Sequence, residues 1–183
     1  YGDDQSDVAD IPYTVKVKTY RVDKKQDIAK EAQHAVFHVP ELHIVTRNYE
    51  RVADDPRVQH RVVMAMDAYG NVTKSGQVTY PRRGTGHDAE QSTMLITVSE
   101  KGLINETGGN GFYRLGVPAE QWQYQLHGIS EPTGLFTRAV LNAIFEDTDT
   151  TEIPYEQNPS GDPEKRIFKH NRTYYYDEQA SSA

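Results

Sequence analysis

Hydrophobic and polar residues alternate along much of the chain with a period of two, which is typical of half-buried β-strands. The alternation is clearest over residues 13–20 and 121–126, and in the second segment every other residue is glutamine. Further strands are predicted over residues 34–39, 42–51, 57–67, 72–80, 93–99, 111–115 and 166–176. The predicted fold class is therefore mainly β, with antiparallel hairpins forming one large or sandwich-like sheet. Strands and helices do not alternate, which argues against a nucleotide-binding α/β fold.

The strongest local signal is the turn sequence DAYGN at residues 67–71, which lies between two strand-forming runs. Gly70 or Asn71 can supply the positive backbone angles that a tight turn requires, and Asp67 can bond nearby backbone amides. The first run is continuously apolar over residues 62–66, as in a strand that is covered on both faces. The sequence therefore predicts a long antiparallel hairpin over residues 57–80.

One short amphipathic helix is predicted near residues 134–146, with Thr133 as its N-cap. Its apolar stripe predicts packing against the core and consists of Leu135, Phe136, Ala139, Val140, Ala143 and Ile144. Loops are predicted over residues 23–32, 81–90 and 146–165, and turns at Gly102 and residues 108–111.

The composition is that of a single cysteine-free domain of 183 residues. A domain of this length can bury roughly 70% of its unfolded surface without a disulfide or a metal. We expect a frayed acidic end at residues 1–11, one β-rich domain at 12–176 and a polar tail at 177–183. The chain starts on Tyr1 without a methionine, so we expect it to be a segment of a longer protein.

The formal net charge is −7, with 27 acidic and 20 basic residues. This balance argues against nucleic acid or an anionic membrane surface as a partner, because either would favour a basic patch. The sequence has no apolar run near the ~20 residues of a membrane span, so direct membrane insertion is not expected.

No catalytic constellation, metal site or cofactor site is predicted. The histidines at 34, 38 and 43 lie in a strand-like, proline-containing segment. In a strand His34 and His38 share a face but lie roughly 13 Å apart, which is too far to share one ion. The glycine runs at 84–86 and 108–111 are not followed by a phosphate-loop lysine or a helix start. The aspartates at 54, 55 and 67 lie where turns are expected. A site made of their carboxylates stays open as an alternative.

The hairpin region resembles the middle-to-C-terminal part of the B component of bacterial insecticidal toxin complexes (Tc toxins). The matching segments there are Tyr49-Glu50-Arg51, Asp55-Pro56-Arg57-Val58, His60, Asp67, Tyr69-Gly70-Asn71-Val72, Lys74-Ser75, Tyr80 and Arg82-Arg83. Weaker matches follow in the same order over nearly the whole chain, from Pro12-Tyr13-Thr14-Val15 to Tyr175. The sequence departs from the family pattern at Thr73 and Pro81, where leucine and glycine are common.

The resemblance implies a structural role without turnover. The Asp67–Asn71 turn is also similar to the Rhs, or YD, repeat, whose hairpins wind into a hollow β-shell. In that family the B and C components enclose a cytotoxic fragment, and a β-propeller elsewhere in B docks on the pentameric A component. The resemblance therefore implies a secreted shell segment whose partners are the rest of the shell, the C component with its fragment and, through other domains, the A pentamer. Asp55, Pro56, Arg57, Asp67, Tyr69, Gly70 and Asn71 would be structural turn and motif residues.

Two other functions compete with this hypothesis. Twelve tyrosines and a tryptophan suit a stand-alone β-sandwich that binds carbohydrate or protein through aromatic rings. A hydrolase would use two carboxylates, such as Asp55 and Asp67, held ~5 to 9 Å apart across a cleft.

Overall fold

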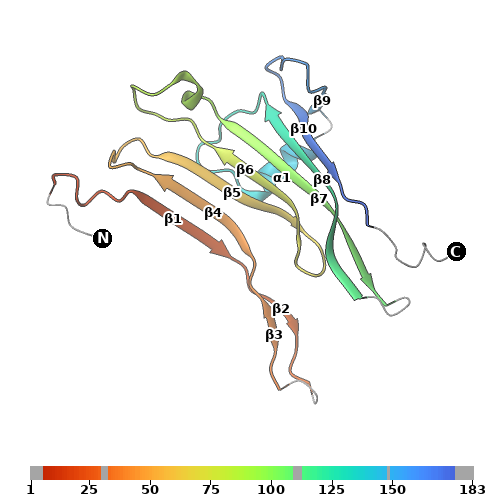
Figure 1. The fold of residues 1–183 in the computed structure, drawn as a ribbon. Coiled ribbons are helices and arrows are strands. Elements are labelled where there is room, and N and C mark those ends of the chain that lie inside the picture. The colour runs from red at the N-terminus through yellow and green to blue at the C-terminus, as the bar shows by residue number, and fades with distance from the viewer. Residues whose placement is uncertain (1–5, 30–32, 109–112, 148, 176–183) are drawn as a thin grey trace.

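The structure is a computed structural model that describes residues 6–29, 33–108, 113–147 and 149–175. Eight strands form one sheet in the order β1-β4-β5-β6-β7-β8-β10-β9 (Figure 1). Its strands are β1 (Thr14–Tyr20), β4 (Glu41–Asn48), β5 (Arg57–Met66), β6 (Val72–Thr79), β7 (Leu95–Thr107), β8 (Tyr113–His127), β9 (Thr151–Ile153) and β10 (Glu164–Arg172). Every pairing is antiparallel except the short β9–β10 pair. The mainly β fold with hairpins and one α-helix is confirmed, as a single large sheet.

Two smaller features lie outside this sheet. The strands β2 (Asp23–Gln26) and β3 (Val36–His38) pair with each other and form an arm that projects beyond the sheet between β1 and β4 (Figure 1). A 3₁₀ turn, η1 (Ala89–Ser92), lies in the loop between β6 and β7. From β4 to β8 each strand pairs with the next one along the chain, so this part of the sheet is a simple meander.

The two faces of the sheet are chemically different. We call the face under the helix α1 (Arg138–Glu146) the covered face, and the opposite one the open face. One row of paired residues on the covered face is Val45, His60, Val78, Ile96 and Leu126. The neighbouring row on the open face is Ile44, Arg61, Gln77, Thr97 and Gln125. Because strand side chains alternate between faces, this register puts the apolar residues on one side.

The core lies between the covered face and the segment that carries α1. Leu141 and Phe145 of α1 are buried with Val62, Met64 and Ile96 of the sheet in one core cluster. The predicted apolar stripe was therefore largely wrong, because Leu135, Ala139, Val140 and Ala143 are exposed and only Phe136 and Ile144 of that set pack in the core. A bulge in β5 shifts the register between Val63 and Ala65. The Met64 carbonyl accepts hydrogen bonds from Arg138 Nε at 2.8 Å and Asn142 Nδ2 at 3.3 Å, so α1 is tied to the bulge.

Several predicted boundaries were wrong. The helix begins at Arg138, not near 134, and its N-cap is Thr137, whose hydroxyl accepts from the Val140 amide at 3.2 Å. The predicted loop over residues 23–32 contains β2, which β3 stabilises by pairing. Within the loop predicted over residues 146–165, β9 pairs with the start of β10.

The segments 111–115 and 121–126 are not separate strands, because both belong to β8. Gly102 is not in a turn, since it lies inside β7 opposite Glu120. The predicted turn at 108–111 lies between β7 and β8 and is largely outside the described residues. The whole polar tail at 177–183 and the first five residues of the acidic end are also outside them. The strand predicted to reach residue 176 ends at Arg172.

Candidate functional site

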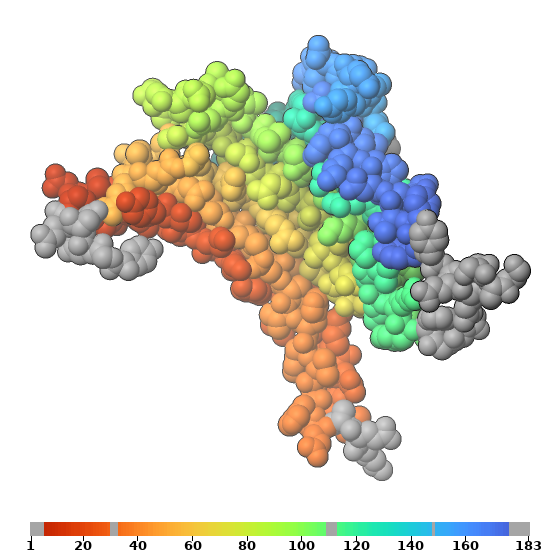
Figure 2. Space-filling view, in the orientation of Figure 1, coloured from red at the N-terminus to blue at the C-terminus, as the bar shows by residue number. Residues whose placement is uncertain are grey.

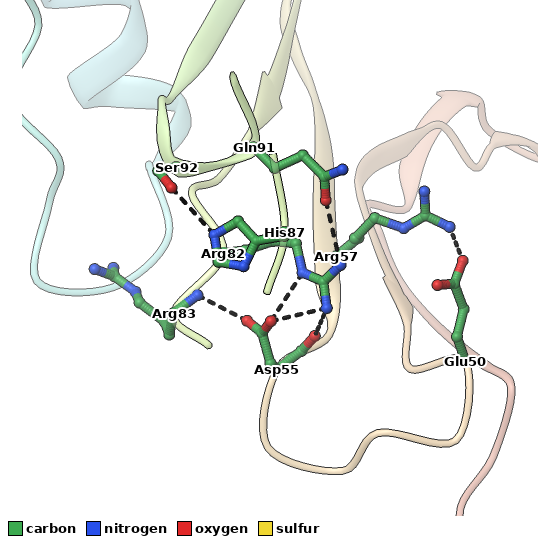
Figure 3. A network of polar contacts seen from close by, with 8 residues as sticks. All are labelled: Glu50, Asp55, Arg57, Arg82, Arg83, His87, Gln91 and Ser92. Atoms are coloured by element: carbon green, nitrogen blue, oxygen red, sulfur yellow. Dashed lines mark hydrogen bonds and ion pairs between the residues drawn. The ribbon is translucent and has the colours of Figure 1, made fainter. Parts of the chain in front are cut away.

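Two aspartate-centred networks lie at opposite ends of β5, and we call them the Asp55 clamp and the Asp67 clamp. In the Asp55 clamp the carboxylate accepts from Arg82 Nε at 2.8 Å and from the Arg83 backbone amide at 2.7 Å (Figure 3). Arg82 also donates to the side chain of Gln91 at 3.2 Å. The clamp therefore joins the loop before β5 to the loop after β6 and to η1.

The environment of Asp55 keeps its carboxylate charged. The residue is buried, with 7% of its surface exposed. Backbone amides of Arg83 and Gly84, and then the Arg82 guanidinium, hold the pKa of Asp55 below its usual value, although burial opposes this shift. A Cβ on Gly84 would lie 2.6 Å from Asp55 Oδ2, so glycine permits the close approach of backbone and carboxylate.

The Asp67 clamp is formed at the tip of the β5–β6 hairpin. Asp67 Oδ1 accepts from the backbone amides of Asn71 at 2.8 Å and Tyr69 at 3.0 Å. Its Oδ2 accepts from the side chains of Asn71 at 2.9 Å and Asn105 at 3.0 Å. Burial raises the pKa of Asp67, but these hydrogen bonds outweigh it and the net shift is downward.

Asn105 connects this tip to the neighbouring β7–β8 hairpin. Besides donating to Asp67, its side-chain oxygen accepts from the Gly116 amide at 2.7 Å. Gly116 has a φ of 68°, and a Cβ there would lie 3.0 Å from the Asn71 side chain. The Asp67 clamp thus stabilises its own turn and also connects two hairpins.

Gly70 adopts the positive backbone angle that the sequence predicts for Gly70 or Asn71, with a φ of 90°. A Cβ at this position would lie 2.5 Å from the His38 ring. Lys25 on the same arm donates to the Ala68 carbonyl at 3.4 Å. The β2–β3 arm therefore rests on the turn at residues 67–71, and glycine allows this contact.

A third polar feature lies in the middle of β5. The His60 ring contacts His43 at 3.0 Å and the Tyr80 hydroxyl at 3.3 Å, and that hydroxyl accepts from the Phe136 amide at 2.8 Å. His60 is 2% exposed, and burial followed by the charges of His43 and Arg47 lowers its pKa to about 4. A neutral ring satisfies both contacts, because one nitrogen donates and the other accepts. This series of hydrogen bonds connects the segment before α1 to the sheet.

The remaining predicted motif residues lie at the edges of the clamps. Arg57 forms an exposed ion pair with Glu50, and Pro56 is half-buried between Asp55 and Arg57. The Tyr69 side chain is exposed, and only its backbone amide belongs to the Asp67 clamp. Sequence reasoning missed His60, Gly84, Gln91 and Asn105 as structural partners, since all of them act across long sequence distances.

The geometry does not bring Asp55 and Asp67 together. They flank the ten residues of β5, and at ~3.3 Å per residue the strand separates them by roughly 30 Å. A two-carboxylate hydrolase requires ~5 to 9 Å, so this pair does not form such a site. Within the described residues, no group of three or more histidine, cysteine, aspartate or glutamate side chains is placed to hold a metal ion. Nor does that part of the chain contain a helix that is long and apolar enough to cross a membrane.

Among the described residues, the exposed aromatic rings come from different parts of the chain. The Trp122 ring is stacked on His170 with centroids 5.2 Å apart, so one of its faces is already occupied. The most exposed tyrosines are Tyr13, Tyr113, Tyr155 and Tyr174, which belong to different segments. This arrangement gives no support to a carbohydrate-binding surface built on stacked rings.

Comparison with known proteins gives a family and a set of similar folds. The family described as insecticide toxin TcdB, middle/C-terminal region, matches residues 1–117. No curated protein matches the chain. The family match includes both clamp aspartates and the whole hairpin between them.

Solved structures resemble nearly the whole chain. A Tc holotoxin pore of Photorhabdus luminescens with a TccC3 mutation matches with a TM-score of 0.74 and 20% identity, over 98% of this chain and 8% of that chain. TcdB2–TccC3 without its hypervariable C-terminal region matches with a TM-score of 0.72 and 20% identity, over 98% and 9%. TcdB2–TccC3–Cdc42 matches with a TM-score of 0.58 and 22% identity, over 68% and 6%. The chain thus spans less than a tenth of each of these larger chains, with which it shares a fold.

Proposed function

Because the chain belongs to the insecticide toxin TcdB middle/C-terminal region family, we propose that it is a non-catalytic wall segment of a Tc toxin B component. The wall would be part of a hollow shell, formed together with the C component, that encloses a toxic effector for delivery into host cells. The complete toxin would be secreted, and contacts with the pentameric A component would be made by other parts of the B component.

The observation that carries this proposal is the large sheet, whose likeness to the chain of a Tc holotoxin covers 98% of the sequence. A wall needs long paired strands and side chains that tie neighbouring hairpins together. The meander from β4 to β8 provides the strands, and the Asp67 clamp provides such a tie. The separation of Asp55 from Asp67 supports a role without turnover.

Protease protection of the effector tests the proposal. In the full-length B component assembled with its C component, we expect the effector to resist trypsin. Leu141→Asp puts a charge into the core under α1, where the side chain is 0% exposed, so it should open the wall and make the effector cleavable. Ala143→Asp places the same charge on the exposed side of α1 and should leave the effector protected. If trypsin cleaved the effector in the unmodified complex as fast as in the Leu141→Asp complex, containment would be ruled out.

A further inference from the structure

The centre of the open face, over β6, β7 and β8, is polar and its only charged residue among the described pairs is Lys101. The other charged residues of this face lie on the strands at its sides, namely Lys16, Lys18, Arg57, Arg61, Glu164, Arg166 and Lys169. Eight half-buried residues on this face are serine, threonine or glutamine, namely Ser75, Gln77, Thr79, Thr97, Ser99, Gln121, Gln123 and Gln125. The arginines near its centre already have partners. Arg61 lies 3.9 Å from Glu41, and Arg166 donates to Gln125 at 3.0 Å.

Some of these amides have no partner of their own. Gln121 donates to Ser99 at 3.1 Å, but within the described part of the chain the side chains of Gln77 and Gln123 make no hydrogen bond. Each carries a donor and an acceptor that match the N–H and C=O groups of a peptide backbone. The centre of the face therefore offers hydrogen bonds from uncharged groups, and the basic residues lie around it.

The open face is also hollowed at its centre. A depression of about 350 Å³ is lined by side chains from five strands, among them Arg61, Gln77, Thr97, Gln123 and Phe168. Figure 2 views the molecule from this side, with α1 hidden behind the sheet. The covered face, in contrast, is filled by α1 and the segments that flank it.

A closed wall has less room on its inside than on its outside. An additional layer, such as α1 with its connections, fits the longer outer circumference, whereas a hollowed face of short polar side chains fits the inner one. Of the nine residues that line the depression, only Val98 and Phe168 have large apolar side chains. This suits a guest chain that must remain mobile, because a large apolar patch would hold it.

We propose that the open face lines the lumen of the shell and contacts the main chain of the enclosed effector polypeptide, while α1 faces outward. This inference rests on the proposed function and adds the orientation of the wall. Gln77 and Gln123 would bind the guest through backbone amide groups.

Site-specific cross-linking tests the orientation. The chain has no cysteine, so each introduced thiol is the only one on its tryptic peptide. Gln77→Cys and Gln123→Cys report on the open face, and Val140→Cys, which replaces a side chain that is 44% exposed on α1, reports on the other. Each variant of the full-length B component is labelled with benzophenone-maleimide, assembled with its C component, checked for assembly by size-exclusion chromatography and irradiated. We expect effector adducts from residues 77 and 123 and none from residue 140.

Adducts from residue 140, or none from 77 and 123, would overturn the orientation. A second readout separates this from failure of containment. Unlabelled cysteine variants of the assembled complex are treated with a polyethylene glycol maleimide that is too large to enter a closed shell. If the thiols at both 77 and 140 react, the wall is not closed and the proposed function fails. If the thiol at 140 is protected and the one at 77 reacts, the shell stands but its orientation is reversed.

Discussion

An aspartate lies at each end of β5, but the two aspartates have different hydrogen-bond partners. Asp55 is nearly buried and pairs with a guanidinium, whereas Asp67 is bonded only to neutral amide groups. The charged clamp joins two loops and η1, and the neutral one joins the tips of two hairpins. The same residue type at a turn can therefore hold either loops or hairpins, depending on which donors the fold brings to it.

This difference predicts unequal sensitivity to substitution. Removing the charge at Asp55 leaves Arg82, which is 20% exposed, without its ionic partner. Removing the charge at Asp67 leaves no unpaired cation, since its side-chain donors are Asn71 and Asn105. The loss of a charged partner next to a mostly buried cation costs more than the loss of a neutral hydrogen bond.

Lowering the pH is expected to reduce the free energy of unfolding more than any of the substitutions below, because His60, which lies between the two clamps, becomes protonated. Its pKa is about 4 in the folded protein, against ~6.5 in the unfolded chain, so the unfolded state takes up the proton first. Stability is then fully present above pH ~6.5 and falls as the pH approaches 4, by up to ~3 kcal/mol. Urea unfolding at pH 7, 6, 5 and 4 measures this loss.

His60→Gln serves as the control, because glutamine keeps a donor and an acceptor but does not titrate. Its stability should depend much less on pH between 6.5 and 4. An equal slope in both proteins would show that His60 is not the source. In the His60→Gln background, the lowered pKa values of both aspartates should leave a second loss of stability at lower pH, as the carboxylates become protonated.

Substitution of the charged clamp is expected to have the next largest effect. Asp55→Asn keeps the shape of the side chain but leaves Arg82 facing a neutral amide. Thermal unfolding should show a larger fall in Tm for Asp55→Asn than for Asp67→Asn, which contains the same chemical change.

Glu50→Gln is the matched control for this comparison, since it removes an exposed ion pair with Arg57 a few residues away. Exposed pairs of this kind contribute little, so its Tm should stay close to that of the unmodified protein. If Asp55→Asn were no more damaging than Asp67→Asn, the distinction between a charged and a neutral clamp would be wrong.

Gly70→Ala tests whether the neutral clamp depends on the backbone at the turn. The φ of 90° and the approach of His38 to 2.5 Å from a new Cβ both oppose a side chain. We expect a loss of about 1–2 kcal/mol in unfolding free energy. Gly134→Ala is the control, because a Cβ there meets no atom within 4 Å and its φ is not in the left-handed region. The double variant Gly70→Ala with His38→Ala should recover the steric part of the loss alone.

These residues also show which parts of the fold the sequence can predict. The turn at 67–71 was predictable because its signal is local: Asp67, Gly70 and Asn71 lie within five positions and interact with one another. The partners from elsewhere, Asn105 and Arg82, were not predictable, since nothing near them in the sequence indicates which aspartate they meet.

The errors in strand prediction have the same origin. Gly116 and Pro118 indicate a break, but both lie within β8, where a positive φ at the glycine and register shifts against β7 accommodate them. Residues 23–26 carry no apolar alternation and form a strand only because β3 pairs with them. Local patterns predict elements that are stable through their own periodicity and miss those that depend on a partner.

The smallest effect is expected for Asn105→Ala, which separates the two hairpins without touching the turn. The variant loses one hydrogen bond to Asp67 and one from Gly116, and water can replace both at this half-buried position. We expect a loss of ~1 kcal/mol in unfolding free energy, measured by urea titration. If the Asp67 clamp is one network, the combined variant with Asp67→Asn should lose less than the sum of the single losses. Strict additivity would mean that Asp67 serves only its own turn, and the β5–β6 and β7–β8 tips would then be independent.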